Sequence, residues 1–162
     1  MKRLIVILAA ALAAVAVTAS VIAQTGETPF PSPKVTGVFV ASQTVTAPGS
    51  TLGAGVLLNR FVRGSTVVFR AYAGEQKSGT LLGSGDVKYF YVKIPDQPNV
   101  KLAYSKANDP TGPWLWKGTW TIPADYPLGL VNLNVLIQTT SKRYGSFVQI
   151  PVASAQLTVI KA

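Results

Sequence analysis

Apolar and polar residues alternate with a period of two along several segments of this chain, the pattern of strands that bury one face. Residues 131–138 are the clearest case: their apolar face is Val131, Leu133, Val135 and Ile137, and asparagine or glutamine occupies most positions between. Three further rows predict inward-facing side chains at Val67, Phe69, Ala71 and Ala73, at Phe90, Val92 and Ile94, and at Val100, Leu102 and Tyr104. Additional strands are expected at 35–42, 52–59, 118–123, 145–150 and 155–160.

Turn residues separate these segments at short intervals, and no window after residue 24 carries apolar residues at helical spacing. The 14 glycines and 11 prolines suit a fold with many turns. Pro151 divides the last long apolar stretch into two strands. About seven to nine short strands in one domain predict an all-β, antiparallel β-sandwich, with a small β-barrel as the alternative.

The N-terminus has the features of an export signal. A positively charged start, Met1-Lys2-Arg3, precedes the apolar run 4–17, and small residues follow at cleavage spacing. We expect a signal peptide over residues 1–23, cleaved before Gln24, with cleavage before Ser20 as the alternative. An uncleaved anchor is the other alternative, since residues 4–23 are just long enough to span a bilayer, and only then does the chain contact a membrane.

The next segment, residues 24–34, contains three prolines and predicts an extended tether. The folded domain is then expected at 35–162. Whether the signal is cleaved or retained, the domain lies outside the cytoplasm, as a secreted protein or one held in the periplasm or cell envelope.

Two passages resemble a known family. Residues 44–52 (TVTAPGSTL) resemble the opening strand and Pro-Gly turn of exported bacterial immunoglobulin-like and macroglobulin-like domains, and residues 120–129 (WTIPADYPLG) resemble their late strand and corner. The resemblance implies an immunoglobulin-like β-sandwich used as an adhesive, structural or accessory module, with no active site common to the family. The chain lacks the cysteine pair of antibody-type domains and a second copy of the module.

The composition argues against catalysis, metal binding and cofactors. There is no cysteine and no histidine, which removes thiol chemistry and the usual zinc and copper ligands. The acidic residues stand singly, mostly beside turn residues: Glu27, Glu75, Asp86, Asp96, Asp109 and Asp125. We therefore expect no catalytic, metal-binding or cofactor-binding residue. A hydrolase whose carboxylates are assembled from distant loops is the remote alternative.

Aromatic residues are the candidates for ligand binding. Trp114, Trp116 and Trp120 have the same parity, so an extended strand places them on one face. Trp120 is expected in the core, whereas Trp114 and Trp116 either extend the core or form an exposed row that stacks on sugar rings or other flat ligands. Tyr89 and Tyr91 raise the same two alternatives.

Charge indicates the class of partner. The chain carries 15 lysines and arginines against 6 acidic residues, a net charge of +9, and loss of Lys2 and Arg3 with the signal leaves +7. The positive residues are dispersed and no nucleic-acid motif accompanies them, so we expect no nucleic acid as partner. An anionic cell-surface polymer or a protein fits better. The sequence thus predicts a non-catalytic exported binding or structural module, with a carbohydrate- or small-ligand-binding module using Trp114 and Trp116 as the alternative.

Overall fold

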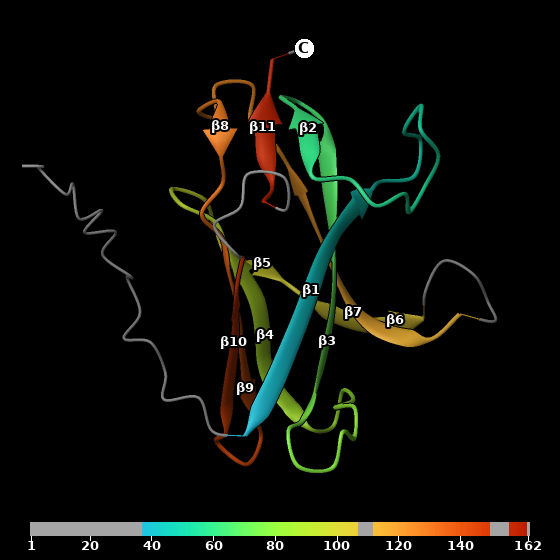
Figure 1. Ribbon diagram of the computed structural model, residues 1–162, viewed down its shortest axis with the longest axis vertical. Coiled ribbons are helices and arrows are strands. Elements are labelled where there is room, and N and C mark those ends of the chain that lie inside the picture. Colours follow the sequence, from blue (N-terminus) through green and yellow to red (C-terminus); the bar gives the residue numbers. More distant parts are fainter. Residues whose placement is uncertain (1–36, 107–111, 150–155, 162) are drawn as a thin grey trace, which may run out of the picture.

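The computed structural model describes residues 37–106, 112–149 and 156–161 (Figure 1). Within these residues the regular secondary structure consists of β-strands, with no helix. Two four-stranded sheets face each other and a three-stranded sheet lies at one end of the pair. The ladders of the described residues do not close into a barrel, so the fold is the expected all-β sandwich rather than the barrel alternative. These residues contain no helix long and apolar enough to cross a membrane. The expected signal, the tether and the first two residues of the domain lie outside them.

The first sheet is antiparallel, in the order β1 (Val38–Thr46), β3 (Thr66–Glu75), β7 (Trp114–Thr121) and β6 (Ala103–Lys106). The second is also antiparallel, in the order β10 (Tyr144–Val148), β9 (Asn134–Thr139), β4 (Val87–Lys93) and β5 (Val100–Lys101). In the third, β11 (Thr158–Ile160) lies between β2 (Arg60–Val62), its parallel partner, and β8 (Gly129–Leu130), its antiparallel partner. The described residues form eleven strands rather than seven to nine, because four of them are only two or three residues long.

The core lies between the two large sheets and is built from the predicted rows. Every inward position expected in the rows at 67–73, 90–94 and 131–137 is buried. The remaining row is mixed, since Leu102 is buried while Val100 and Tyr104 are half-buried. Each fully buried apolar side chain of this size stabilises the fold by roughly 1.5–3 kcal/mol.

The two large sheets approach each other along both lateral margins. At one margin the chain passes from β5 into β6 through Leu102, and β7 runs past it so closely that a Cβ on Gly118 would lie 2.9 Å from the Lys101 carbonyl oxygen. At the other margin, a Cβ on Gly145 of β10 would lie 2.8 Å from the Val38 carbonyl oxygen of β1. Both contacts depend on a residue without a side chain.

The strand expected at 52–59 is not formed, and that prediction was wrong. Residues 47–59 instead make a turn-rich loop that folds back along the end of β1. Gly53 and Gly55 hold φ angles of 87° and 77°, in the left-handed region that a strand does not use. Thr46 fixes the loop, because its hydroxyl donates to the Gly53 carbonyl oxygen at 2.6 Å.

Other strand limits differ from expectation by a few residues. The strand expected at 35–42 continues to Thr46, and the one expected at 118–123 begins at Trp114. The break expected at Pro151 lies outside the described residues.

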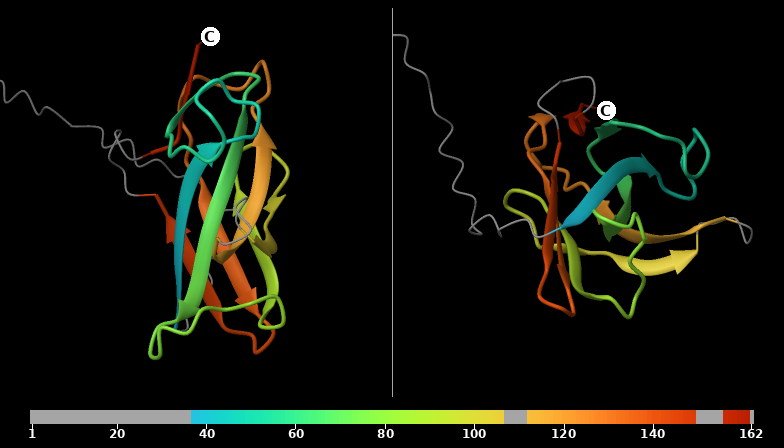
Figure 2. Two further views of the ribbon diagram at one scale, coloured as in Figure 1. Left: turned by 90° about the vertical axis from the view of Figure 1, so that its right-hand side faces the viewer. Right: turned by 60° about the horizontal axis from the view of Figure 1, so that its bottom comes forward.

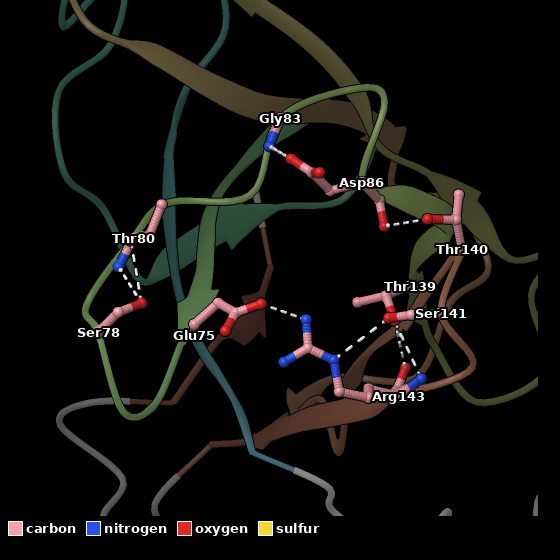
Figure 3. A network of polar contacts seen from close by, with 9 residues as sticks. All are labelled: Glu75, Ser78, Thr80, Gly83, Asp86, Thr139, Thr140, Ser141 and Arg143. Carbon is pink, nitrogen blue, oxygen red and sulfur yellow. Dashed lines mark hydrogen bonds and ion pairs between the residues drawn. The ribbon is translucent and has the colours of Figure 1, made fainter.

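A polar network joins the loops at the end of the sandwich away from the third sheet (Figures 1 and 3). Glu75 at the end of β3 pairs with Arg143 beyond β9, and the guanidinium holds the pKa of Glu75 below its ordinary value. The Asp86 carbonyl oxygen accepts the Thr140 amide at 2.9 Å, and the Asp86 carboxylate accepts the Gly83 amide at 2.9 Å. The network therefore ties the β3–β4 connection to the β9–β10 turn.

Candidate functional site

The sequence left open whether Trp114 and Trp116 face the core or a ligand, and the structure separates them. Trp116 is 6% exposed and packs against Phe90, with ring centroids 5.3 Å apart. Its indole N–H donates to the Leu82 carbonyl oxygen at 3.2 Å. Trp116 is thus a core residue, as is Trp120, and it offers no free face to a ligand.

Trp114 is 49% exposed, although it has the same parity on β7 as the buried tryptophans. The β6–β7 hairpin extends beyond the second sheet, so no described strand of that sheet faces this end of the hairpin (Figure 1). Tyr104 of β6 stacks on Trp114, with centroids 5.2 Å apart and planes 21° apart. Tyr104 also lies 5.1 Å from the Trp116 ring, which anchors it to the core. We call Tyr104 and Trp114 the aromatic pair.

Tyr89 and Tyr91 lie elsewhere, on the outer face of the second sheet. Tyr89 is 51% exposed, with the Lys88 ammonium 5.1 Å from its ring centroid. Tyr91 is half-buried, and burial raises the pKa of its hydroxyl. Because β4 and β7 belong to different sheets, these tyrosines and Trp114 do not form one surface.

A groove of about 650 Å³ crosses the outer face of the first sheet. Its floor is formed by outward-facing residues of β3 and β7, one side by Pro48 of the 47–59 loop, and the other by residues 98–101 leading into β5. The apolar residues in its described lining are Val45, Pro48, Val68, Pro98, Val100 and Trp120, of which Val45, Val68 and Trp120 are buried. We call this hollow the basic groove, for the charges described next.

Three cationic side chains line the basic groove: Arg70, Lys101 and Lys117. Arg70 and Lys117 are direct cross-strand partners in the β3–β7 ladder, and Gln43 of β1 is the partner of Arg70 on its other side. Among the described residues that line the groove, none is an aspartate or glutamate. Like charges directly opposite each other in a sheet are destabilising, by an amount on the order of 0.2–1 kcal/mol.

Arg70 is the most constrained of the three. Its Nε atom is buried and has no hydrogen-bond partner. The 47–59 loop lies against its guanidinium, because a Cβ on Gly55 would come within 2.6 Å of Arg70 Nη2. Leaving a buried polar group unsatisfied costs roughly 1–3 kcal/mol. The fold therefore holds a partly desolvated cation beside a second cation.

Three of the described carboxylates lie in other parts of the fold, whereas Asp96 lies in the turn just before the groove residue Pro98. Glu75 and Asp86 belong to the polar network at the other end of the β3 strand, and Asp125 lies in the turn after β7. A second hollow of about 460 Å³ lies between the 47–59 loop and β2, and Arg60 is the one charged residue among the described residues that line it. Among the described positions no three His, Cys, Asp or Glu residues gather as a metal site would require. Glu27 and Asp109 lie outside the described residues.

Sequence reasoning did not single out Arg70, Lys117 or Tyr104 as site residues. Alternation along β3 predicts that Arg70 faces outward, but its neighbour is set by the register of β3 against β7. Positive residues that are dispersed along the chain are thus brought together on one face by strand pairing. No local sequence signal marks that arrangement.

Comparison of the chain with protein family models, with curated proteins and with solved structures found no match.

Proposed function

We propose that this chain is a non-catalytic, exported binding module of the immunoglobulin-like type that attaches to an anionic polymer of the cell envelope or extracellular space. The strand order supports the fold type. β1-β3-β7-β6 facing β10-β9-β4-β5 corresponds to the A-B-E-D and G-F-C-C′ sheets of immunoglobulin-like sandwiches. Such a sandwich provides a rigid scaffold whose surfaces and loops carry the binding function.

The observation that carries the anionic partner is the basic groove. The described residues that line one hollow include three cations and no carboxylate, and the chain carries a net charge of +9. A cleft lined by one sign of charge raises the local concentration of counter-charged ligands and speeds their association. This favours binding to a polyanion over a purely structural role.

Retention of the mature domain on immobilised anionic polymer, measured across a salt titration, tests the function. We expect retention at low salt that falls steeply toward physiological ionic strength, because the screening length shortens from about 30 Å at 0.01 M to about 8 Å at 0.15 M. A neutral polymer on the same support is the control. Equal retention on both supports, or none on the anionic one at low salt, contradicts the proposal.

Export is tested separately by N-terminal sequencing of the protein recovered outside the cytoplasm. A new N-terminus at Gln24 or Ser20 is the expected result. An intact Met1 in the membrane fraction indicates the uncleaved anchor, and recovery only from the cytoplasm contradicts export.

The aromatic pair supports a second candidate function, a carbohydrate-binding module. A half-exposed tryptophan held by a stacked tyrosine presents one flat apolar face of the kind that packs on a sugar ring. This binding should be nearly independent of salt and lost in Trp114→Ala. The matched control, Tyr89→Ala, removes an equally exposed aromatic ring from the other sheet and should leave it unchanged.

A further inference from the structure

We infer that one end of the sandwich, formed by the outward face of the third sheet and the 47–59 loop, is a surface for peripheral attachment to a bilayer that contains anionic phospholipid. The inference goes beyond the proposed function and does not use the basic groove. It also departs from the expectation that the chain contacts a membrane only through an uncleaved signal segment. Three features support it: where apolar side chains are exposed, how they adjoin one another, and which charges lie beside them.

Exposed apolar side chains are concentrated at this end of the molecule. Of the twelve large apolar side chains that are exposed among the described residues, six belong to the 47–59 loop or to the third sheet. Both elements lie at the end away from the polar network (Figure 1). Exposed apolar patches mark surfaces that bind proteins or membranes. We call these six residues the apolar end: Leu52, Val56, Leu57, Val62, Leu130 and Ile160.

The strand register makes this surface continuous. Ile160 of β11 is the direct partner of Val62 in the β2–β11 ladder, so both side chains project from the same face. On the other side of β11, Leu130 is the partner of Thr158 and therefore lies diagonally across from Ile160 on that face. Leu52 and Val62 both line the second hollow, which joins the loop to the third sheet. The loop and the sheet are thus parts of one surface.

Positive charges lie beside the apolar end. Arg60 is exposed on the outward face of β2 and lines the second hollow. Lys161 follows Ile160 directly and is also exposed. Asp96 and Asp125 lie on the β4–β5 and β7–β8 connections, outside both elements. Anionic headgroups attract lysine and arginine near a bilayer surface, whereas apolar side chains enter the boundary between headgroups and acyl chains.

Charge and composition favour a bilayer over other occupants of this surface. A second copy would bring together two chains that each carry a net charge of +9, which repel each other. The centres of protein interfaces are enriched in aromatic residues and methionine, whereas all six side chains of the apolar end are aliphatic. An anionic bilayer matches both the charge of the chain and the aliphatic character of the surface.

The first test compares apolar side chains at this surface and away from it. Leu57→Gln and Leu130→Gln each remove one from the apolar end, and Leu81→Gln removes a comparably exposed one from the β3–β4 connection at the opposite end. The purified protein is mixed with vesicles of phosphatidylcholine and phosphatidylglycerol in equal parts, and bound protein is separated by sedimentation. We expect Leu57→Gln and Leu130→Gln to weaken binding about fivefold or more, through lost apolar burial, and Leu81→Gln about twofold or less.

The second test concerns charge. Arg60→Gln should weaken binding to these vesicles about fivefold, whereas Lys77→Gln, which removes an exposed cation from the β3–β4 connection, should weaken it about twofold or less. Vesicles of phosphatidylcholine alone should bind the original protein more weakly, and Arg60→Gln should change that binding little. Because every replaced side chain is exposed, the variants should unfold at the same urea concentration as the original protein.

A third measurement reports which part of the protein enters the bilayer. The chain has no cysteine, so a polarity-sensitive dye can be attached at one chosen position. On Leu57→Cys the dye should shift its emission to shorter wavelength when anionic vesicles are added, because this position enters an apolar environment. On Leu81→Cys the emission should stay unchanged. The comparison holds whether or not the N-terminal segment is retained, and it decides the question if a glutamine variant is less stable than the original protein.

The outcomes distinguish this inference from the proposed function. Leu57→Gln and Leu130→Gln should leave retention on anionic polymer unchanged, because neither residue lines the basic groove. If the protein does not bind anionic vesicles, or if the dyes at positions 57 and 81 respond alike, the inference is wrong and the proposed function is unaffected. A dimer that forms without vesicles and dissociates in Leu130→Gln, measured by sedimentation velocity, would place a second copy on this surface and also overturn the inference.

Discussion

Replacing Trp120 by alanine should be among the most destabilising single changes in the molecule. The side chain is 6% exposed and packs against Tyr126, with centroids 5.0 Å apart and planes 78° apart. It lies on β7, opposite Val67 of β3, at the junction of sheet and corner. Truncation removes the largest side chain type from a position where the surrounding strands are held by their ladders.

Truncation of a buried tryptophan typically costs about 3–5 kcal/mol, through lost burial and the cavity left behind. The edge-to-face contact with Tyr126 accounts for roughly 0.5–1.5 kcal/mol of that loss. The indole N–H bond to Gln97 is long, at 3.4 Å, and adds little. Because Trp120 also lines the basic groove, water can enter part of the vacated space. We therefore expect Trp120→Ala to cost about 3–4 kcal/mol.

Equilibrium unfolding in urea, followed by far-ultraviolet circular dichroism, measures this difference without using tryptophan as the probe. The slope with denaturant should stay constant between the two proteins, so that the midpoint shift reports stability. Trp120→Phe is the matched control, and it should cost about 1–2 kcal/mol because a ring remains against Tyr126. A loss below about 1 kcal/mol for the alanine variant would show that the inward assignment of this β7 face is wrong.

Three other changes have expected outcomes. Gly145→Ala should destabilise the fold by about 1–3 kcal/mol in the same urea assay, because the added methyl group meets the Val38 carbonyl oxygen at 2.8 Å. An unchanged midpoint of unfolding would mean that β1 and β10 separate freely. The hydrogen bond from Arg143 lowers the pKa of Glu75, so the pairing stabilises the fold above pH 4.5 and this stability is lost as pH falls through the folded pKa. Glu75→Gln should therefore show a shallower loss of stability in acid. Parallel acid curves for the two proteins would contradict this. Burial, and secondarily Asp96, raises the pKa of the Tyr126 hydroxyl above its ordinary value of 10.0. The stability contributed by the neutral hydroxyl is therefore present below pH 10.0 and is lost as pH rises through the folded pKa. Tyr126→Phe should show a shallower loss of stability at alkaline pH, and identical alkaline curves for the two proteins would contradict this.

Much of the sandwich follows from alternation alone, because burial on one face imposes a period of two. The rows at 67–73, 90–94 and 131–137 were predicted in this way and all are buried. The expected strand at 52–59 failed for a local reason, since Gly53 and Gly55 take left-handed conformations and Thr46 bonds to the loop. An apolar run with glycines at its second and fourth positions fits either structure, and only the contact with β1 decides between them.

The candidate site was less accessible to sequence reasoning. Parity correctly placed Trp114 and Trp116 on one face, but their different exposure depends on where the second sheet ends. The pairing of Arg70 with Lys117 depends on register between strands that are distant in the chain. Periodicity gives the direction of a side chain, whereas a groove requires the positions of neighbours that periodicity does not contain.

The nine-residue ladder between β1 and β3 also determines how the domain should respond to a pulling force. The described chain enters β1 at one end of the molecule and leaves β11 at the other (Figures 1 and 2). Tension applied at Gly37 and Lys161 therefore acts along β1, and all nine of its registered pairs bear the load in shear at the same time. The β2–β11 ladder has three pairs and should rupture first. Single-molecule extension should accordingly record a weak early release of the C-terminal strand, followed by one strong event as β1 separates from β3.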